Sequence, residues 1–434
     1  MTKYRLIGTM TGNSMDAIDL VLTEFDGDYI TDIYTYSKAF SKQMQRQMDK
    51  ILRPNVLNKT ASEILALPDF KEIHDTYIHK VADCINEMLA QNNIDKNTID
   101  AIGFHGKTLD HNPPSKAKSE GTKPYTLQIG SGQMLADLTG IPVVYDFRSA
   151  YIMNDFDGSP LVPPHNAHIA ATEGDGCYYN GGNTSNFAWI IDGVARIAAD
   201  AGPFNEYTDN FIRQYSSDTY DKDGKYGLKG KLLPDLIQKL FDKGRTYYER
   251  SFPKSGDPAY YFKEEIFAEI EKIYKKPKSD SQTFCNLVHT FEYFAAYIAV
   301  QALTLTDTSL KLPDKIILFG GGWKNPVVRH SFDELITGQG FVLPEHQQQF
   351  SDFFNRFTQT PTVRYSNFGE FMEARLFADL ARYYLENRVW EVPEVVASGQ
   401  KIIAGVKRIP HEGPINDKIN LAAKGWDKIN IDKK

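Results

Sequence analysis

Cysteine is scarce in this chain of 434 residues, and the three that occur lie far apart. Cys84, Cys177 and Cys285 are odd in number and form no C-x-x-C pair, so neither a disulfide framework nor a zinc site is indicated. Long apolar runs are also missing, because the most apolar helical stretch, residues 291–305, is interrupted by a glutamate and a glutamine. We therefore expect a protein of the reducing cytoplasm, with neither an export signal nor a membrane span.

Positive charge is not in excess: 49 Lys and Arg residues stand against 56 Asp and Glu residues, a formal net charge of −7. Nucleic acids and anionic membrane surfaces are therefore poor partners, and small-molecule chemistry is favoured. The hydrophobic content of 41% is ordinary for a globular protein. A chain of this length predicts two domains, and the sequence leaves the oligomeric state open, with a homodimer as one option.

The most informative segment is LIGTMTGNSMDAIDLVLTE, near the start of the chain, in which two apolar runs flank a polar turn. This pattern predicts a β-hairpin. Gly8 and Gly12 would let the backbone approach a ligand closely. Asn13 and Ser14 supply hydrogen-bond donors, and Asp16 adds a carboxylate suited to a hydrated cation. A phosphate group with its Mg²⁺ would fit this turn, although an ordinary polar hairpin explains the segment alone equally well.

Further along the chain, apolar strands alternate with segments of helical periodicity, which is typical of an α/β protein. From about Cys177 the same order of strands and then helices recurs. Several strands end in polar residues, and ligands gather outside strand ends in open α/β sheets. We expect one helix over Ala61–Asn92, a turn over residues 105–108, and a strand over Val194–Ala199 that ends just before Asp200.

The first turn reads G-x-M-T-G-N-S-M-D-A-I-D. It resembles the first phosphate loop of the anhydro-N-acetylmuramic acid kinases, G-x-M-S-G-T-S-x-D-G-I-D, a family in the superfamily of sugar kinases, actin and heat-shock ATPases. Further short matches follow in the same order, from Gly8 to Ala378. Departures from the family pattern mark a divergent member, at Asn13, Ala17, Lys107, Asp157, Asn183, Ala201 and Phe204.

The resemblance implies a two-lobed α/β fold in which each lobe follows the ribonuclease-H-like plan of the actin-like ATPases, with a central interdomain cleft. We expect an N-terminal lobe over residues 1–150 and a C-terminal lobe over residues 151–395. Residues 396–434 would form a C-terminal extension, to which we assign no chemistry.

Four residues are candidates for binding a sugar. Asp146 and Arg148 lie in YDFRSAYIMNDFDGSPLVP, which resembles the family segment from D-F-R to G-Q-G-A-P-L-V-P. His105 in GFHGKTLDH aligns with the family S-H-G-Q-T, and Gln128 lies in a T-L-Q-I-G match. Arg148 offers a planar fork for a carboxylate or sugar hydroxyls, and Asp146 could orient it. The alternatives are a structural Asp146–Arg148 pair, a structural histidine, and a glutamine that supports a loop.

Three glycine turns of the second half are candidates for nucleotide binding. The segment NGGNTSN resembles the second phosphate loop, N-I-G-G-I-A-N, and keeps Gly182. The segment DAGPFN resembles D-T-G-P-G-N, in which the first residue, here Asp200, is the catalytic base and Gly202 would let phosphates approach. The turn after the predicted buried strand Lys315–Phe319 resembles C-G-G-G-x-x-N-P. It contains Gly320, Gly321, Gly322 and Asn325.

Glu373 in GEFMEARLFADLA aligns with the family glutamate of the final helix. The resemblance implies that Glu373 is a catalytic residue and, with Asp16, a ligand of the metal. The alternative is a solvated glutamate on a helix surface.

Taken together, the resemblance implies a kinase that uses ATP and Mg²⁺ and acts on 1,6-anhydro-N-acetylmuramic acid in cell-wall recycling. Water would open the 1,6-anhydro ring, Asp200 would accept a proton from that water, and the freed O6 would take the γ-phosphoryl group to give N-acetylmuramic acid 6-phosphate. Two alternatives stay open: a kinase for another anhydrosugar such as levoglucosan, and a nucleotide- or sugar-binding homologue without turnover.

Overall fold

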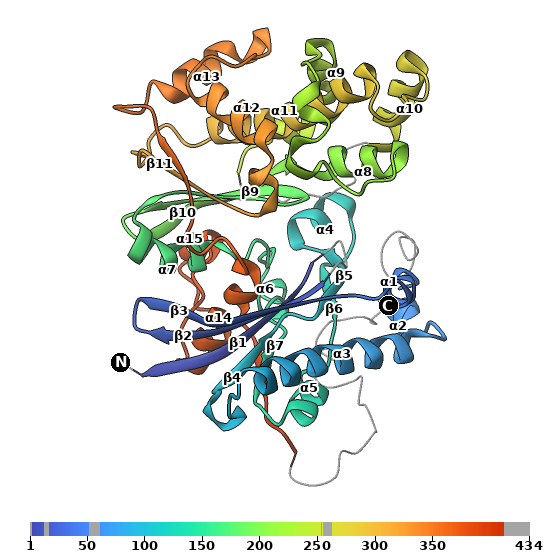
Figure 1. Cartoon of the computed structure of the whole chain (residues 1–434). Helices are drawn as coiled ribbons and strands as arrows, with labels where there is room; N and C mark the ends of the chain where they lie inside the picture. Colours follow the sequence, from blue (N-terminus) through green and yellow to red (C-terminus); the bar gives the residue numbers. More distant parts are fainter. Residues whose placement is uncertain (1, 13–16, 52–60, 253, 255–262, 412–434) are drawn as a thin grey trace. The chain divides into compact units, whose positions relative to one another are not determined.

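The computed structural model describes residues 2–12, 17–51, 61–252, 254 and 263–411 (Figure 1). The chain divides into two compact units. The first unit comprises Met1–His165 and Phe371–Lys434, and the second unit is the uninterrupted segment Asn166–Glu370. The chain enters the second unit inside helix α7 (Pro163–Glu173), later than the expected boundary at residue 150, and the final long helix belongs to the first unit.

A six-stranded sheet of order β13-β7-β4-β1-β2-β3 forms the framework of the first unit. Strands β1, β2 and β3 form an antiparallel meander, and β4 and β7 continue the sheet parallel to β1. The strands are β1 (Lys3–Thr11), β2 (Ala17–Asp26), β3 (Tyr29–Ala39), β4 (Ala101–Phe104), β7 (Val143–Tyr145) and β13 (Val406–Arg408). The pairing of β1 with β2 confirms the predicted hairpin, whose residues 13–16 lie outside the described residues.

The helices of the first unit differ from the predicted pattern at two places. The expected single helix over Ala61–Asn92 is wrong, because Pro68 interrupts it between α2 and α3. The expected turn over residues 105–108 is also wrong, because Lys107 begins strand β5 (Lys107–Asn112), which pairs with β6 (Tyr125–Ile129). The helices are α1 (Lys42–Asp49), α2 (Ala61–Leu65), α3 (Phe70–Gln91), η1 (Lys96–Thr98), α4 (Pro114–Glu120), α5 (Gly132–Thr139), α6 (Ser149–Ile152), α14 (Met372–Leu385) and α15 (Pro393–Ser398).

Helix α14 packs directly on the backbone of β1 and β4. Successive residues of a strand point to opposite faces, so Ile7 lies in the hydrophobic core with α3 while Gly8 faces α14. A Cβ atom at Gly8 would lie 1.8 Å from the carbonyl oxygen of Ala374, and one at Gly103, its partner in register, would lie 1.9 Å from that of Phe377. Packing of the helix therefore requires glycine at residue 8. The sequence had suggested a different reason for this glycine, namely close approach of the backbone to a ligand.

The second unit repeats this plan with a five-stranded sheet of order β10-β9-β8-β11-β12. Strands β8, β9 and β10 form an antiparallel meander, and β11 and β12 continue it parallel to β8. The strands are β8 (Gly176–Gly181), β9 (Thr184–Ile191), β10 (Val194–Pro203), β11 (Lys315–Phe319) and β12 (Thr362–Tyr365). Order and direction match those of β3-β2-β1-β4-β7, so the predicted duplicated α/β fold is confirmed.

Strand β10 is longer than the sequence predicted. It continues through Asp200 to Pro203, with a register shift between Asp200 and Gly202. Small residues at Ala199 and Ala201 are buried in the core here, so the strand can pass close to the helices that cover it. The predicted base therefore lies inside an irregular strand and not beyond its end.

Helices cover the sheet of the second unit, and Figure 1 shows α8–α13 gathered on one side of β9 and β10. Nearly the whole length of α11 is buried in an aromatic-rich core. The helices are α8 (Glu206–Tyr215), η2 (Lys222–Gly224), η3 (Gly227–Lys229), α9 (Pro234–Tyr248), α10 (Lys263–Tyr274), α11 (Gln282–Thr304), η5 (Gly321–Lys324), α12 (Pro326–Ile336), η6 (Pro344–His346) and α13 (Gln347–Phe354). Across the part of the chain that the structure describes, no helix has the length and apolar character needed to cross a membrane.

Candidate functional site

Two of the predicted nucleotide turns are hydrogen-bonded to each other in the second unit. The turn between β8 and β9 contains Gly182 and Asn183, and the segment after β10 leads into α8. The backbone N–H of Phe204 donates to the carbonyl of Asn183 (2.8 Å), and that of Asn205 donates to the carbonyl of Gly182 (3.1 Å). The family pattern has glycine where Phe204 stands, and the buried Phe204 ring instead packs edge-on against Trp323.

The third predicted turn, after β11, lies against both of these segments. Gly320 has a positive φ of 93°, and a Cβ atom there would lie 2.5 Å from Oδ1 of Asn180. A Cβ atom at Gly322 would lie 2.7 Å from Oδ1 of Asn205, whereas one at Gly321 would meet no atom within 4 Å. Two of the three glycines are therefore required by packing, and Gly321 is the one whose α-carbon faces open space.

Asn325 closes this turn and begins α12. Its Oδ1 accepts from the backbone N–H groups of Val327 (2.9 Å) and Val328 (3.2 Å), which caps the helix. Its Nδ2 donates to Oε1 of Glu292 on α11 (2.6 Å). Both polar atoms of the Asn325 side chain thus have partners inside the second unit, so the residue fixes the shape of the turn.

Asp200, the predicted base, is half-buried on β10. Its backbone N–H donates to the carbonyl of Lys254 (2.9 Å), and the buried Nζ of Lys254 donates to the carbonyl of Tyr248 at the end of α9 (3.0 Å). The pKa of Lys254 is lowered to about 7, mainly by burial and then by the charge of Arg250, while the charge of Asp200 opposes the change. Sequence analysis missed Lys254, since a single lysine in a polar segment forms no pattern.

Gly202, which the resemblance assigned to phosphate approach, packs on helices. A Cβ atom there would lie 2.6 Å from Cγ2 of Ile298 on α11 and 3.2 Å from Cε1 of Tyr248 on α9. Core packing therefore accounts for glycine at this position, and its contact with phosphate stays a prediction.

In the first unit, the structure brings two of the predicted sugar-binding residues together. Nε2 of His105 lies 3.4 Å from Nε and 3.3 Å from Nη2 of Arg148, whose Nη1 donates to the carbonyl of Gly158 (2.6 Å). Burial, and then the charges of Arg148 and Lys107, hold the pKa of His105 well below its ordinary value. The imidazole is therefore neutral: Nδ1–H donates to the carbonyl of Gly106 (3.1 Å), and Nε2 accepts from the guanidinium.

The other two predicted sugar-binding residues have partners of their own. Asp146 has a left-handed backbone with φ 57°, and its carboxylate accepts from Oγ of Ser149 (2.5 Å) rather than from the neighbouring arginine. Burial raises the pKa of Asp146. Nε2 of Gln128 donates to Oγ1 of Thr126 (2.7 Å) and Oγ1 of Thr108 (3.3 Å) within the β5–β6 sheet. Gln128 thus links these two strands, and its contact with a sugar stays a prediction.

The predicted phosphate and metal residues of the first unit are only partly described. Asn13, Ser14 and Asp16 lie outside the described residues, whereas Gly12 is half-buried after β1. Glu373 is exposed in the first turn of α14. It precedes Ala374, whose carbonyl faces Gly8.

Two departures from the family pattern have structural roles. Lys107 is buried, and its Nζ donates to the carbonyl of Gly12 (3.0 Å), so it anchors the first turn. The carboxylate of Asp157 accepts from the backbone N–H (2.9 Å) and Oγ (2.6 Å) of Ser115 at the start of α4. Both residues hold loops that the resemblance assigns to ligand binding.

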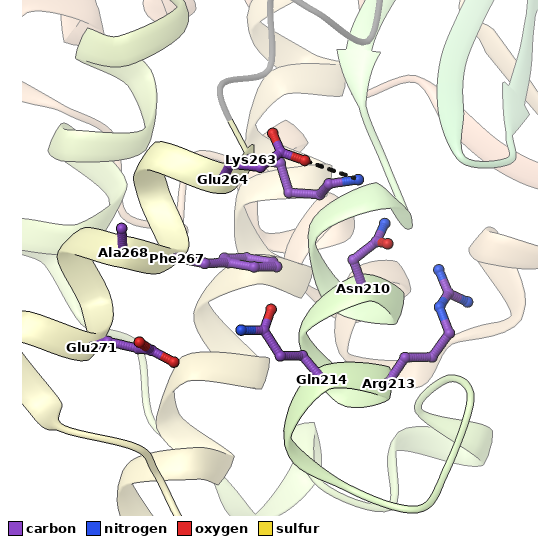
Figure 2. Close-up of a pocket in the computed structure, with 8 residues that line it drawn as sticks. All are labelled: Asn210, Arg213, Gln214, Lys263, Glu264, Phe267, Ala268 and Glu271. Atoms are coloured by element: carbon purple, nitrogen blue, oxygen red, sulfur yellow. Dashed lines mark ion pairs between the residues drawn. The ribbon is translucent and has the colours of Figure 1, made fainter. Parts of the chain in front are cut away.

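A cavity of about 490 Å³ lies elsewhere in the second unit, between α8 and α10 (Figure 2). Its polar side chains are engaged within the protein: Lys263 pairs with Glu206 (2.9 Å), and Arg213 donates to the carbonyl of Thr219 (3.1 Å). None of the predicted site residues lines it, so we assign it no part in the chemistry. The lining residues are Asn210, Arg213, Gln214, Lys263, Glu264, Phe267, Ala268 and Glu271.

Comparison with known proteins agrees with the order of the motifs. The family model "Anhydro-N-acetylmuramic acid kinase" matches residues 4–407. The chain is 27% identical to a protein of that name from Vibrio vulnificus over 408 residues, which cover 93% of this chain and 98% of the relative. It is 28% identical to one from Shewanella loihica over 360 residues, 80% of this chain and 86% of the relative.

Among solved structures, the chain is similar to the ROK hexokinase from Thermus thermophilus, with 13% identity, a TM-score of 0.31, and coverage of 87% of this chain and 97% of that chain. This likeness is too distant to carry a conclusion. The family model, by contrast, takes in both units and every predicted site residue, so the chain belongs to the anhydro-N-acetylmuramic acid kinase family and is an ATP-dependent sugar kinase.

Proposed function

We propose that this kinase acts on 1,6-anhydro-N-acetylmuramic acid in the cytoplasm, in the recycling of cell wall. Water opens the 1,6-anhydro ring, and O6 takes the γ-phosphoryl group of ATP to give N-acetylmuramic acid 6-phosphate. The observation that carries this proposal is the family match over residues 4–407. The third glycine turn of the second unit supports it, because a Cβ atom at Gly321 would meet no atom within 4 Å and the backbone there can approach a ligand closely.

The second unit would hold the nucleotide. Gly321 leaves open space beside the third turn, and the N-terminus of α12 favours negative charge. Asp16 and the exposed Glu373 would hold Mg²⁺, since carboxylate oxygens are the ligands that this hard cation prefers. When bound, Mg²⁺ would neutralise charge on the phosphates.

His105 and Arg148 would position the sugar. A neutral His105 keeps the guanidinium of Arg148 in place without adding a second positive charge. Nε, Nη1 and Nη2 of Arg148 each donate within the protein, so the residue would act through its positive charge, which suits a carboxylate. The proposed substrate carries a carboxylate on its lactyl group, whereas levoglucosan has none. This pair therefore favours the muramic acid derivative over a neutral anhydrosugar.

Asp200 would accept the proton from the water that attacks the anomeric carbon. Neutral water is a poor nucleophile, so the step needs a base within reach. As the C1–O6 bond breaks, O6 becomes the nucleophile toward the γ-phosphorus. The hydrogen bond from the Asp200 backbone to Lys254 holds this part of the irregular strand in place.

The direct test is to incubate the purified protein with ATP, Mg²⁺ and a panel of anhydrosugars in ¹⁸O-labelled water. We expect phosphorylation of 1,6-anhydro-N-acetylmuramic acid, with label at the anomeric hydroxyl and none in the phosphate ester bridge. Preferred turnover of levoglucosan would show that levoglucosan is the substrate. The absence of turnover with every sugar would instead favour a binding protein.

The second test is Asp200→Asn, which keeps the size of the side chain and removes the proton acceptor. We expect kcat to fall about 10²- to 10⁴-fold, with nucleotide affinity little changed. Asp192→Asn is the matched control, because Asp192 is exposed in the turn that leads into β10 and its left-handed backbone also suits Asn. Turnover of Asp200→Asn at the rate of the control would show that the base is another residue.

A further inference from the structure

Glu292 is a buried carboxyl group of the second unit that has no role in the proposed reaction. Glu292 lies in the middle of α11 and is buried. Its Oε1 accepts from Nδ2 of Asn325 (2.6 Å), and Oδ1 of the same Asn325 caps α12. The side chain of Asn325 therefore links the carboxyl group of Glu292 to the turn after β11.

The surroundings of Glu292 leave it almost no freedom. A Cβ atom at Gly227, in η3, would lie 1.8 Å from Oε2 of Glu292, so η3 covers this oxygen closely. Asp221 lies on the same side and is fixed by hydrogen bonds from the backbone N–H groups of Tyr226 and Gly227, each 2.9 Å long. The carboxyl group of Glu292 is thus tightly packed between η3 and the start of α12.

Two acids face Glu292 from neighbouring elements, Asp221 before η2 and Asp209 on α8. Burial and then the charge of Asp221 raise the pKa of Glu292 well above its ordinary value, and burial raises the pKa of Asp209 to about 6. Since Oε1 accepts from Asn325, the proton of a neutral Glu292 belongs on Oε2, which is buried and has no hydrogen-bond partner among the described residues.

We propose that Glu292 is a positioning residue for the nucleotide: it holds Asn325, and through it the Gly320–Asn325 turn and the N-terminus of α12, in the conformation that receives ATP. The inference rests on the proposed role of this turn in nucleotide binding. Removing the acceptor would leave Nδ2 of Asn325 buried without its partner, and the side chain would turn away from its capping position.

The experiment measures the affinity for ADP with Mg²⁺ by calorimetry. Glu292→Leu removes the acceptor toward Asn325, and we expect binding to weaken about tenfold or more. Glu292→Gln keeps the acceptor toward Asn325 at nearly the same size, so we expect affinity within about twofold of the wild type. The matched control is Gln301→Leu on the same helix, because Gln301 is buried and its side-chain N and O have no hydrogen-bond partners in the described structure. Its nucleotide affinity should not change.

Comparison of the two variants separates positioning from general stability, and it needs only variants that fold. Both variants lack an ionisable group at residue 292, and only Glu292→Gln keeps an acceptor for Asn325. We therefore expect affinity for ADP close to that of the wild type in Glu292→Gln and weakened affinity in Glu292→Leu.

Equal affinity of folded Glu292→Leu and the wild type, or an equal loss of affinity in folded Glu292→Leu and Glu292→Gln, would overturn the inference. Binding of ADP without phosphorylation of any anhydrosugar would overturn the proposed substrate and leave the inference standing. A wild type that binds no nucleotide would overturn both.

Discussion

Buried ionisable side chains shape the chemistry of this kinase at the scale of single residues. Burial is the main cause of the lowered pKa of His105 and Lys254 and of the raised pKa of Glu292. In each case the neutral form is favoured, because the protein interior solvates charge poorly. For His105, the outcome is a hydrogen-bond acceptor for Arg148.

Lys254 gives a pH dependence of stability whose sign can be worked out. Its pKa is about 7 in the folded chain and 10.5 in the reference state, so between these values the unfolded chain binds the extra proton. The free energy of unfolding therefore rises as the pH increases from about 7 to 10.5. The stability that neutral Lys254 contributes above this window is lost as the pH falls to 7. Lys254→Met removes the titration, so its Tm relative to that of the wild type should fall from pH 6 to pH 10.

Thermal unfolding followed by circular dichroism at each pH checks this prediction. Lys311→Met is a suitable control, because Lys311 lies in an exposed segment before β11. A constant difference in Tm between Lys254→Met and the wild type at every pH would contradict the lowered pKa.

At the scale of single elements, close packing of helix on sheet explains several glycines. The approach of α14 to β1 and β4 leaves no room for a Cβ atom at Gly8 or Gly103. The same holds for α11 at Gly202. These contacts join segments that are far apart in the sequence, and a sequence pattern alone cannot show them.

Gly8→Ala should therefore destabilise the first unit. The added methyl group would force the Ala374 carbonyl and the start of α14 outward, and overpacking of this kind costs about 1–3 kcal/mol or more in the free energy of unfolding. Urea unfolding measures the loss. Gly321→Ala is the control, because its Cβ atom would meet open space and its free energy of unfolding should change by less than about 0.5 kcal/mol. Equal stability of the two variants would contradict the packing described here.

The sequence predicted the long periodic elements well, and it missed those that depend on distant partners. The pattern predicts a helix over Thr283–Leu305 and a strand over Lys315–Phe319, and the ends of α11 and β11 lie within one residue of these bounds. Strand β13 was missed because its support comes from pairing with β7, far away in the chain. Helix α7, which begins with two prolines, has almost no amphipathic pattern, and no helix was predicted there. Within the candidate site, the motifs located His105 and Arg148 but gave no sign that the two residues touch.

At the scale of the whole molecule, each unit has its own sheet, its own core and its own share of the predicted site. The second unit contains Asp200 and the three nucleotide turns, and the first contains His105 and Arg148. Strand order now shows the duplication that the sequence suggested only through resemblance to a family. Because the predicted nucleotide residues and the predicted sugar residues lie mainly in different units, we predict that the two substrates protect different segments.

Hydrogen exchange can test this division. An ATP analogue with Mg²⁺ should slow exchange of the backbone amides at residues 181–184, 202–206 and 320–326 of the second unit, and of the first turn at residues 9–17. The sugar should slow exchange at residues 104–107 and 146–149 of the first unit. Protection of residues 104–107 by the nucleotide alone would contradict the assignment of His105 to the sugar.

The path of the chain also bears on how the protein is made. The second unit is one continuous segment, whereas the first unit receives α14 (residues 372–385) and β13 (residues 406–408) only after it. A growing chain that emerges from the ribosome can finish the second unit while β1 and β4 still lack the helix that covers Gly8 and Gly103. Synthesis thus exposes one face of the first sheet until more than four-fifths of the 434 residues have been added, and the half that is started first is the last to close.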